Sequence, residues 1–244
     1  MTAEKITGWD EAMKENKTIK REKLQWWDVV VVSIILFGFA IYNSTSIFFT
    51  TSTEVLEQGT VFTSLDNWFG IFTIIIELSL SYLYLKIRRF DFSQWKYRIT
   101  WKGTLAAVGI FVLMSLAMDL LDIVHYGWKE ATAYVGQGGI WYVLSEIDFS
   151  LILFSLMNGV YEEIFFLGVC TSVPESQQKG VLIYSLVIRT AFHTYQGMVS
   201  ALGIGLIIGG IYYYLYKKKG QNLYPYMLSH SFADIFGVGF LALL

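Results

Sequence analysis

The sequence has few residues that break helices or cross-link chains. Its 244 residues include two prolines and one cysteine, Cys170. A single cysteine excludes an intramolecular disulfide. We expect Cys170 to pack near a helix end rather than to act as a nucleophile. With so few prolines and no low-complexity tract, the chain has no candidate for a long flexible linker.

Charged residues are also scarce. They make up 16% of the chain, whereas hydrophobic residues make up 55%. Soluble domains carry about 25% charged and about 45–50% apolar residues. The net charge of -2 gives no basis for nucleic-acid binding. The composition therefore predicts an all-α, polytopic transmembrane helix bundle.

Apolar segments divide the chain into about seven expected membrane spans. A helix that crosses a bilayer core needs about 20 apolar residues. The fourth segment is longer than this, and we expect it to tilt or to begin as an interfacial helix around Glu146 and Asp148. The expected spans are 29–48, 68–85, 105–124, 141–170, 181–196, 199–216 and 223–244.

Basic residues gather on one side of these spans. Lys and Arg cluster before the first span, between the second and third, and after the sixth, whereas the loop 50–67 has neither. Cytoplasmic loops carry such an excess of basic residues. We therefore expect a cytoplasmic N-terminus, an external C-terminus and a plasma-membrane location. A small chain with this pattern fits a bacterial membrane.

The chain divides into three regions by composition. Residues 1–25 are polar and lysine-rich, and we interpret them as a cytoplasmic basic tail rather than a secretory leader. Residues 26–140 contain the first three spans. Residues 141–244 contain the remaining spans and the polar clusters described next, and we expect this region to be the catalytic core. Glycines in the sixth span predict close helix packing: Gly203, Gly205, Gly209 and Gly210.

Ionisable residues lie inside the apolar segments of this last region. Such residues are costly in a membrane and usually have a function. Two of the chain's three histidines are among them, and two pairs have the i, i+4 spacing that places both members on one helix face. The set is Glu162, Glu163, Arg189, His193, His230 and Asp234.

At about 1.5 Å per residue, the expected depths of these side chains are similar. Glu162 would lie roughly 12 Å, His230 roughly 10 Å and His193 roughly 18 Å from the inner ends of their spans. We therefore expect one cavity, open to the cytoplasm. Each residue alone has a structural interpretation, such as an interhelical hydrogen bond for Glu163 or an interfacial position for Arg189. Their combination favours a site.

The residue types suit hydrolysis. A glutamate with a neutral histidine, here Glu162 with His193, can hold and deprotonate a water molecule. A second histidine with an aspartate, here His230 with Asp234, can bind a metal or stabilise an oxyanion. Zinc held by Glu162, His193 and His230 is one expectation that the sequence leaves open.

These residues resemble the motifs of a known family. The chain is similar to the CAAX-protease and bacteriocin-processing family of intramembrane endopeptidases, also called the Abi family, over about residues 145–240. That family carries a Glu-Glu pair, then an aromatic residue and a histidine on the next span, and His-x-x-x-Asn/Asp on a later one. The matching residues are Glu162-Glu163, Phe192-His193 and His230 with Asp234.

One position departs from the family pattern. The first family motif ends in an arginine four places after the second glutamate, and this chain has Leu167 there. Some similar members carry the arginine before the histidine instead, where this chain has Arg189. We therefore expect Arg189 to form a bidentate pair with Glu163, with Glu162 and His193 paired in front of it.

The resemblance implies hydrolysis of a peptide bond in or near the membrane. Its expected partners are membrane lipids and a membrane-associated substrate, such as a bacteriocin, pheromone or prenylated precursor, with no nucleic acid. The family has been described both as metal-dependent and as glutamate-dependent. Two alternatives are an inactive member that regulates a partner such as a sensor kinase, and a transporter with a proton relay. The transporter predicts inverted repeats, which the sequence lacks.

Overall fold

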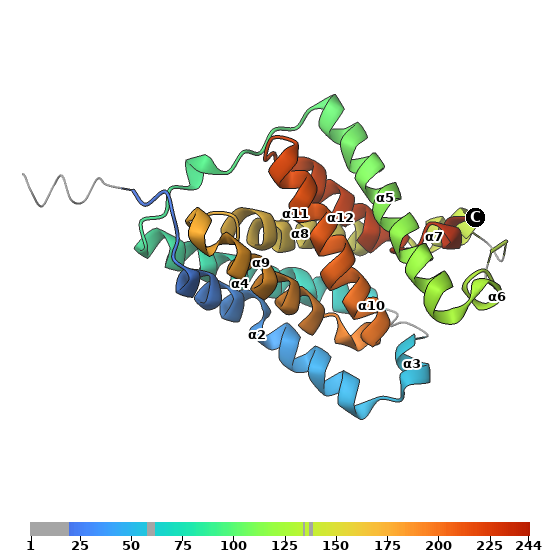
Figure 1. Ribbon diagram of the computed structural model, residues 1–244. Coiled ribbons are helices and arrows are strands. Elements are labelled where there is room, and N and C mark those ends of the chain that lie inside the picture. Colours follow the sequence, from blue (N-terminus) through green and yellow to red (C-terminus); the bar gives the residue numbers. More distant parts are fainter. Residues whose placement is uncertain (1–19, 58–61, 134, 137–138) are drawn as a thin grey trace, which may run out of the picture.

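The protein is a single bundle of helices (Figure 1). The computed structural model describes residues 20–57, 62–133, 135–136 and 139–244. Every regular element in these ranges is helical, which confirms the predicted all-α class. Most of the expected basic tail, residues 1–19, lies outside the described residues. The division of the chain into three regions stays a prediction.

Within the part of the chain that the structure describes, five helical segments are long and apolar enough to cross a membrane. They are α2 (Trp26–Thr50), α4 (Ser64–Ile87), α5 (Trp101–Tyr126), α8 with the π-helical η2 (Phe149–Val169), and the continuous segment Met198–Lys218. That last segment comprises α10 (Met198–Leu202), the π-helical η4 (Gly203–Ile208) and α11 (Gly209–Lys218).

Two further helices coincide with expected spans but are shorter. They are α9 (Glu175–Ala191), with 17 residues, and α12 (Tyr224–Phe236), with 13. Each of the seven expected spans therefore contains a helix. The shorter connecting elements are α3 (Thr53–Glu57), η1 (Phe92–Gln94), α6 (Trp128–Ala131), α7 (Gly139–Glu146), η3 (Thr194–Gln196) and η5 (Leu241–Leu243).

Four span boundaries differ from the expected ones by five or more residues, and one of them is the start of α9, at Glu175 rather than at 181. The long fourth segment breaks where the Asp148 carboxylate accepts a hydrogen bond from the Leu151 amide at 2.7 Å and so begins α8. The seventh span ends at Phe236 rather than at residue 244, because Gly237 has a φ of +82°. The fifth span ends at Ala191 rather than at 196, because the chain turns toward α2.

The helices form a closed ring. In order around it, α2 packs against α4, α4 against α8, α8 against α12, α12 against α5, α5 against η4, η4 against α9, and α9 against α2. Helices distant in sequence are thus neighbours. The helices α2, α4 and α5 complete the ring that the helices of the last hundred residues begin (Figure 1). A membrane bundle of this kind satisfies its backbone hydrogen bonds within each helix.

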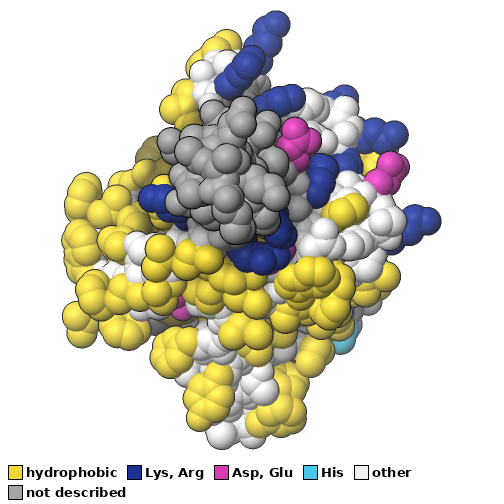
Figure 2. Space-filling view, turned by 90° about the vertical axis from the view of Figure 1, so that its left-hand side faces the viewer, with side chains coloured by type: hydrophobic (Ala, Val, Ile, Leu, Met, Phe, Trp, Pro, Cys, Tyr) yellow, Lys and Arg dark blue, Asp and Glu magenta, His cyan; other side chains and the backbone are white. Residues whose placement is uncertain are grey.

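One end of the bundle is basic and closed. Figure 2 shows Lys and Arg side chains gathered on this face. The rings of Phe90, Phe92 and Trp95 pack together there, with centroids 5.3–5.4 Å apart. The Trp95 indole also donates to Ser172 at 3.2 Å. The segments that carry these basic residues flank the inner ends of the expected spans: Lys20, Arg21, Lys23, Lys86, Arg88, Arg89, Lys96, Arg98, Lys102, Lys179, Lys217, Lys218 and Lys219.

Glycine allows close contact between η4 and α9. A Cβ atom at Gly205 would lie 2.8 Å from the backbone nitrogen of Thr190, closer than real contacts come. Added Cβ atoms at Gly203 and Gly209 would also collide with neighbouring side chains, at 2.7 and 2.8 Å. At Gly210 nothing lies within 4 Å. The predicted packing role is confirmed for the first three glycines of this stripe and is wrong for the fourth.

We predict that Gly205→Ala destabilises the protein and that Gly210→Ala does not. The added methyl group at 205 must push η4 away from α9, and such overpacking costs about 1–3 kcal/mol. At 210 the same change meets open space. Thermal unfolding in detergent, followed by tryptophan fluorescence, should show a midpoint lowered by several degrees only for Gly205→Ala. Equal midpoints would contradict the close contact.

Candidate active site

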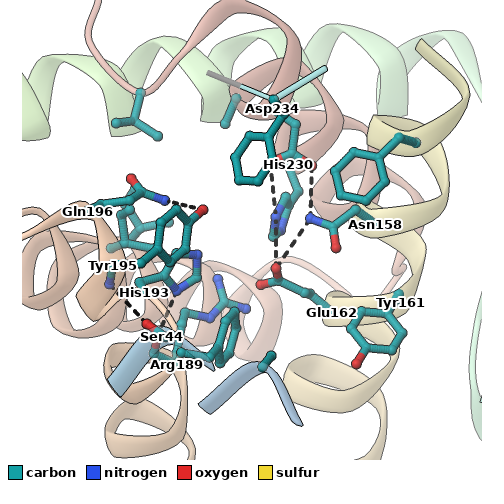
Figure 3. Close-up of a pocket in the computed structure, with 18 of the residues that line it drawn as sticks. Ser44, Asn158, Tyr161, Glu162, Arg189, His193, Tyr195, Gln196, His230 and Asp234 are labelled. Atoms are coloured by element: carbon teal, nitrogen blue, oxygen red, sulfur yellow. Dashed lines mark hydrogen bonds and ion pairs between the residues drawn. The ribbon is translucent and has the colours of Figure 1, made fainter. Parts of the chain in front are cut away.

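The ring of helices encloses a cavity of about 650 Å³. Figure 3 shows its polar side chains, which come from α2, α8, α9, the turn after α9, and α12. Five of the six predicted site residues line it: Glu162, Arg189, His193, His230 and Asp234. The sixth, Glu163, is fully buried behind the cavity wall. The sequence prediction that these residues share one site is therefore consistent with their placement.

The two glutamates are adjacent but point in different directions. Glu162 faces the cavity, whereas the Glu163 side chain is 0% exposed and turns toward α9 and α12. Successive residues of a helix are about 100° apart, which explains the difference. The chain then continues as the π-helical segment η2, a local widening that is frequent at functional sites.

Glu163 forms a buried ion pair with Arg189. The Arg189 Nη2 atom donates to Glu163 Oε1 at 2.7 Å, and both side chains are almost completely buried. The guanidinium also lies 4.0 Å from the centroid of the Phe166 ring and 5.6 Å from that of Tyr212. The predicted partners are confirmed, but the bidentate geometry is wrong. Glu163 Oε2 has no hydrogen-bond partner.

Arg189 and His230 share one oxygen of Glu163, and among the described residues its other oxygen has no hydrogen-bond partner. His230 Nδ1 lies 2.8 Å from Glu163 Oε1, the atom that already accepts from Arg189. The other ring nitrogen of His230, Nε2, lies 3.7 Å from Glu162 Oε1 and 3.7 Å from Asp234 Oδ1. His230 thus lies among three carboxylates, and the expected shared face of His230 and Asp234 is confirmed.

Asn158 connects two of these carboxylates. Its side-chain amide donates to Asp234 Oδ2 at 2.9 Å and to Glu162 Oε1 at 3.3 Å (Figure 3). The sequence analysis missed this residue. The signal that could have found it is its position four residues before Glu162, on the same helix face.

His193 lies beyond the helix on which it was expected. It precedes the turn η3, because Ser44 of α2 accepts a hydrogen bond from the Tyr195 amide and contacts the Thr194 hydroxyl, both at 2.9 Å. His193 Nδ1 lies 2.7 Å from the Arg189 carbonyl oxygen. A carbonyl only accepts, so Nδ1 carries the hydrogen, and Nε2 of the neutral ring is an acceptor.

Glu162 and His193 lie on opposite sides of the cavity (Figure 3). The described side chains do not form the expected direct contact between Glu162 and His193. Glu162 instead contacts Asn158 and His230, whereas His193 contacts the Arg189 carbonyl. Glu162 Oε2 has no hydrogen-bond partner.

Among the described residues, the group that could hold a metal ion consists of Glu162, Glu163 and His230. Their ligand atoms lie within 4.8 Å of one another, and His193 is not in the group. Carboxylate and imidazole groups are zinc ligands by type. However, Glu163 Oε1 already accepts from Arg189 and faces His230 Nδ1. Because this oxygen already has two partners, the arrangement fits an ion pair better than a metal centre. The zinc expectation stays an untested prediction.

Leu167, at the position of the family arginine, is buried near the same ion pair. Leu167 and Arg189 line one small void, together with Phe166 and Tyr212. A guanidinium carried by either position would therefore reach the same neighbourhood. This placement explains how the chain can have Leu167 in the motif and still supply a cation to Glu163.

The fold and the site define a multi-pass helical membrane protein with a buried carboxylate–imidazole centre. A family model described as type II CAAX prenyl endopeptidase Rce1-like matches residues 145–236. This segment includes all six predicted site residues, and its match confirms the resemblance stated from the motifs. No curated protein and no solved structure matches the chain.

We predict strong coupling between Arg189 and Glu163. Removing one partner leaves an uncompensated buried charge, so Arg189→Leu and Glu163→Gln should each cost about 3–5 kcal/mol. The double variant should cost less than the sum of the two. The measurement is the unfolding midpoint in detergent for the four members of the cycle. Additive losses, or a harmless Arg189→Leu, would show that the pair does not hold the site.

A relocated arginine provides a sharper test of the same pair. Leu167→Arg, added to Arg189→Leu, should recover part of the lost stability because both positions reach the same void. Arg189→Lys should recover less, since an ammonium lacks the planar face that lies over Phe166. Recovery by lysine alone would mean that only the charge matters.

Proposed function

We propose that the protein is an intramembrane endopeptidase in which Glu162 activates a water molecule. The observation that carries the proposal is the cavity itself, which presents Glu162 and His193 from opposite sides within an Rce1-like segment. The substrate in this proposal is a peptide segment of a membrane-associated protein or precursor. The family likeness supports the reaction type, and the cavity geometry supports the roles of the residues.

The water molecule is held by two acceptors. One is the Glu162 carboxylate, which lines the cavity, and the other is Nε2 of His193, which can accept because Nδ1 donates to the Arg189 carbonyl. Glu162 takes a proton from the water, and the oxygen attacks the carbonyl carbon of the peptide. The water is placed by fixed groups, which lowers the entropic cost of reaction.

His230 stabilises the oxyanion in this mechanism. Its Nδ1 donates to Glu163, and its Nε2 lies at 3.7 Å from Glu162 and Asp234, so the imidazolium form is surrounded by carboxylates. Nε2–H donates to the oxyanion as the tetrahedral intermediate forms. When the C–N bond breaks, Glu162 returns its proton to the leaving nitrogen, which gives a carboxylic acid and an amine.

Arg189 and Glu163 have a supporting role. The cation compensates one carboxylate of the pair, so Glu162 need not share the cavity with a second free negative charge. This removes the main reason for an inactive regulator, which was the absence of an arginine at position 167. In the proposal Asn158 orients Glu162 and Asp234 on either side of His230.

We predict that Glu162→Gln abolishes peptide cleavage. The amide cannot take a proton from water, so the rate should fall by at least about 10²-fold. Purified protein would be incubated with a panel of membrane-tethered peptides and the products identified by mass spectrometry. The matched control is Glu175→Gln, an exposed glutamate at the start of α9, which should cleave at the wild-type rate. Cleavage that survives Glu162→Gln would exclude this residue as the base.

We also predict that metal chelation leaves cleavage unchanged. Glu163 already pairs with Arg189, and the proposed mechanism needs no Lewis acid. Activity would be compared before and after dialysis against 1,10-phenanthroline, and again after zinc is restored. A loss that zinc reverses would contradict the glutamate mechanism and support a metal centre.

A further inference from the structure

We infer that the site takes its substrate from the extracytoplasmic side, as a peptide segment presented on the outer face of the membrane. This inference rests on the proposed function for the reaction, but its evidence is the direction in which the cavity opens. It reverses the expectation from the sequence, which placed the opening on the cytoplasmic side.

The cavity lies mainly in the non-basic half of the bundle. Its wall on α2 runs from Phe37 to Ile47, in the half of the helix remote from the basic end at Trp26. On α4 it includes Asn67, near the start, whereas the basic residues follow the end of that helix. Phe62, in the loop before α4, also lines it and is 55% exposed. The opening therefore lies among these loops.

The later helices show the same asymmetry. On α8 the wall runs from Leu151 to Glu162, and the part of the segment beyond Glu163 is buried in the core. On α12 it runs from His230 to Val238, past the helix end. Gln196, in the turn after α9, completes the wall on the same side. Most of the cavity wall thus lies in the halves of the helices that are distant from the basic loops, and Glu162 and Tyr212 are among the wall residues that reach past the middle of their segments.

The basic end offers no second entrance among the described residues. Phe165, Val169 and Val173, which follow the glutamate pair, are each 0% exposed. Beyond them, Trp95 donates to Ser172, and the aromatic cluster of the 90–95 loop covers this end. A peptide arriving from this side would have to displace a packed apolar core.

The charge distribution assigns the sides of the membrane. The basic residues named above all lie at the closed end, and the excess of Lys and Arg marks the cytoplasmic face (Figure 2). At the opposite end the exposed acids Asp66, Glu130, Glu146 and Asp148 outnumber one lysine, Lys129. The closed end is thus cytoplasmic, and the cavity opens outward.

The same acids indicate the chemistry of the substrate. Asp66 is adjacent to Asn67 of the cavity wall, and Asp148 begins the helix that carries Glu162. Hydrogen bonds from the Ser64 hydroxyl and the Leu151 amide hold the pKa of Asp148 below its usual range, so it is negatively charged. Neither acid lines the cavity itself, but charges of one sign near an opening concentrate the opposite sign in the solution around it. The segment favoured here carries Lys or Arg.

Cysteine labelling of intact cells tests the direction of opening. The native Cys170 is buried, so a Cys170→Ala background supplies a chain without thiols. Phe62→Cys and Leu151→Cys report on the mouth and on the cavity wall next to it, and Tyr97→Cys, exposed at the basic end, is the matched control. A membrane-impermeant maleimide should label the first two from outside. It should label position 97 only after the cells are permeabilised.

Any pattern of labelling other than this one overturns the inference. Labelling of position 97 from outside would invert the orientation, and protection of position 151 would show that the cavity is closed to the outside. Asn43→Cys, which lines the same wall, replaces Leu151→Cys if that variant does not fold. Because labelling needs no catalysis, its result is independent of whether Glu162 hydrolyses a peptide.

Two small reagents of opposite charge test the substrate preference. At Leu151→Cys, a cationic methanethiosulfonate should react at least several-fold faster than an anionic one, after correction for their rates with free cysteine. Asp66→Asn with Asp148→Asn should reduce this ratio. Equal corrected rates in the unaltered mouth would overturn the preference for a basic segment.

Discussion

The ion pair between Arg189 and Glu163 is the interaction on which the site depends. Two adjacent glutamates in a membrane interior would repel each other and resist ionisation, and one buried cation changes that balance. The 2.7 Å contact connects α9 to α8, and His230 of α12 contacts the same carboxylate oxygen. Three helices are thereby held around one atom, and Glu162 is left to face the cavity.

The two ends of the bundle differ, as such a site requires. Packed aromatic and aliphatic side chains close the basic end, whereas polar side chains such as Asn158 line a cavity toward the other end. Lipid provides no hydrogen bonds to compensate buried polar groups, so they must find partners inside the ring. Glu77 illustrates the rule, because it accepts a hydrogen bond from the Tyr161 hydroxyl at 2.7 Å.

Predictions from the sequence succeeded where a property is local. Hydropathy located a helix in every expected span, and helical spacing placed His230 and Asp234 on one face. They failed where a neighbouring helix decides the conformation. His193 left its helix because the turn that follows it is bound to Ser44, some 150 residues away in the chain. The geometry of the Arg189–Glu163 pair also depends on tertiary packing, which brings His230 of α12 to the same carboxylate oxygen.

The sequence by itself determined the helical class, the membrane location, the likeness to a protease family and the identities of the paired charges Arg189 and Glu163. Composition, periodicity and motif spacing are properties of the chain that survive any packing. Only the tertiary structure decided that Asn158 joins the site and that the cavity opens away from the basic residues. Both depend on which halves of seven helices approach closely, and that is set by side-chain volumes at contacts such as Gly159 against Ser231.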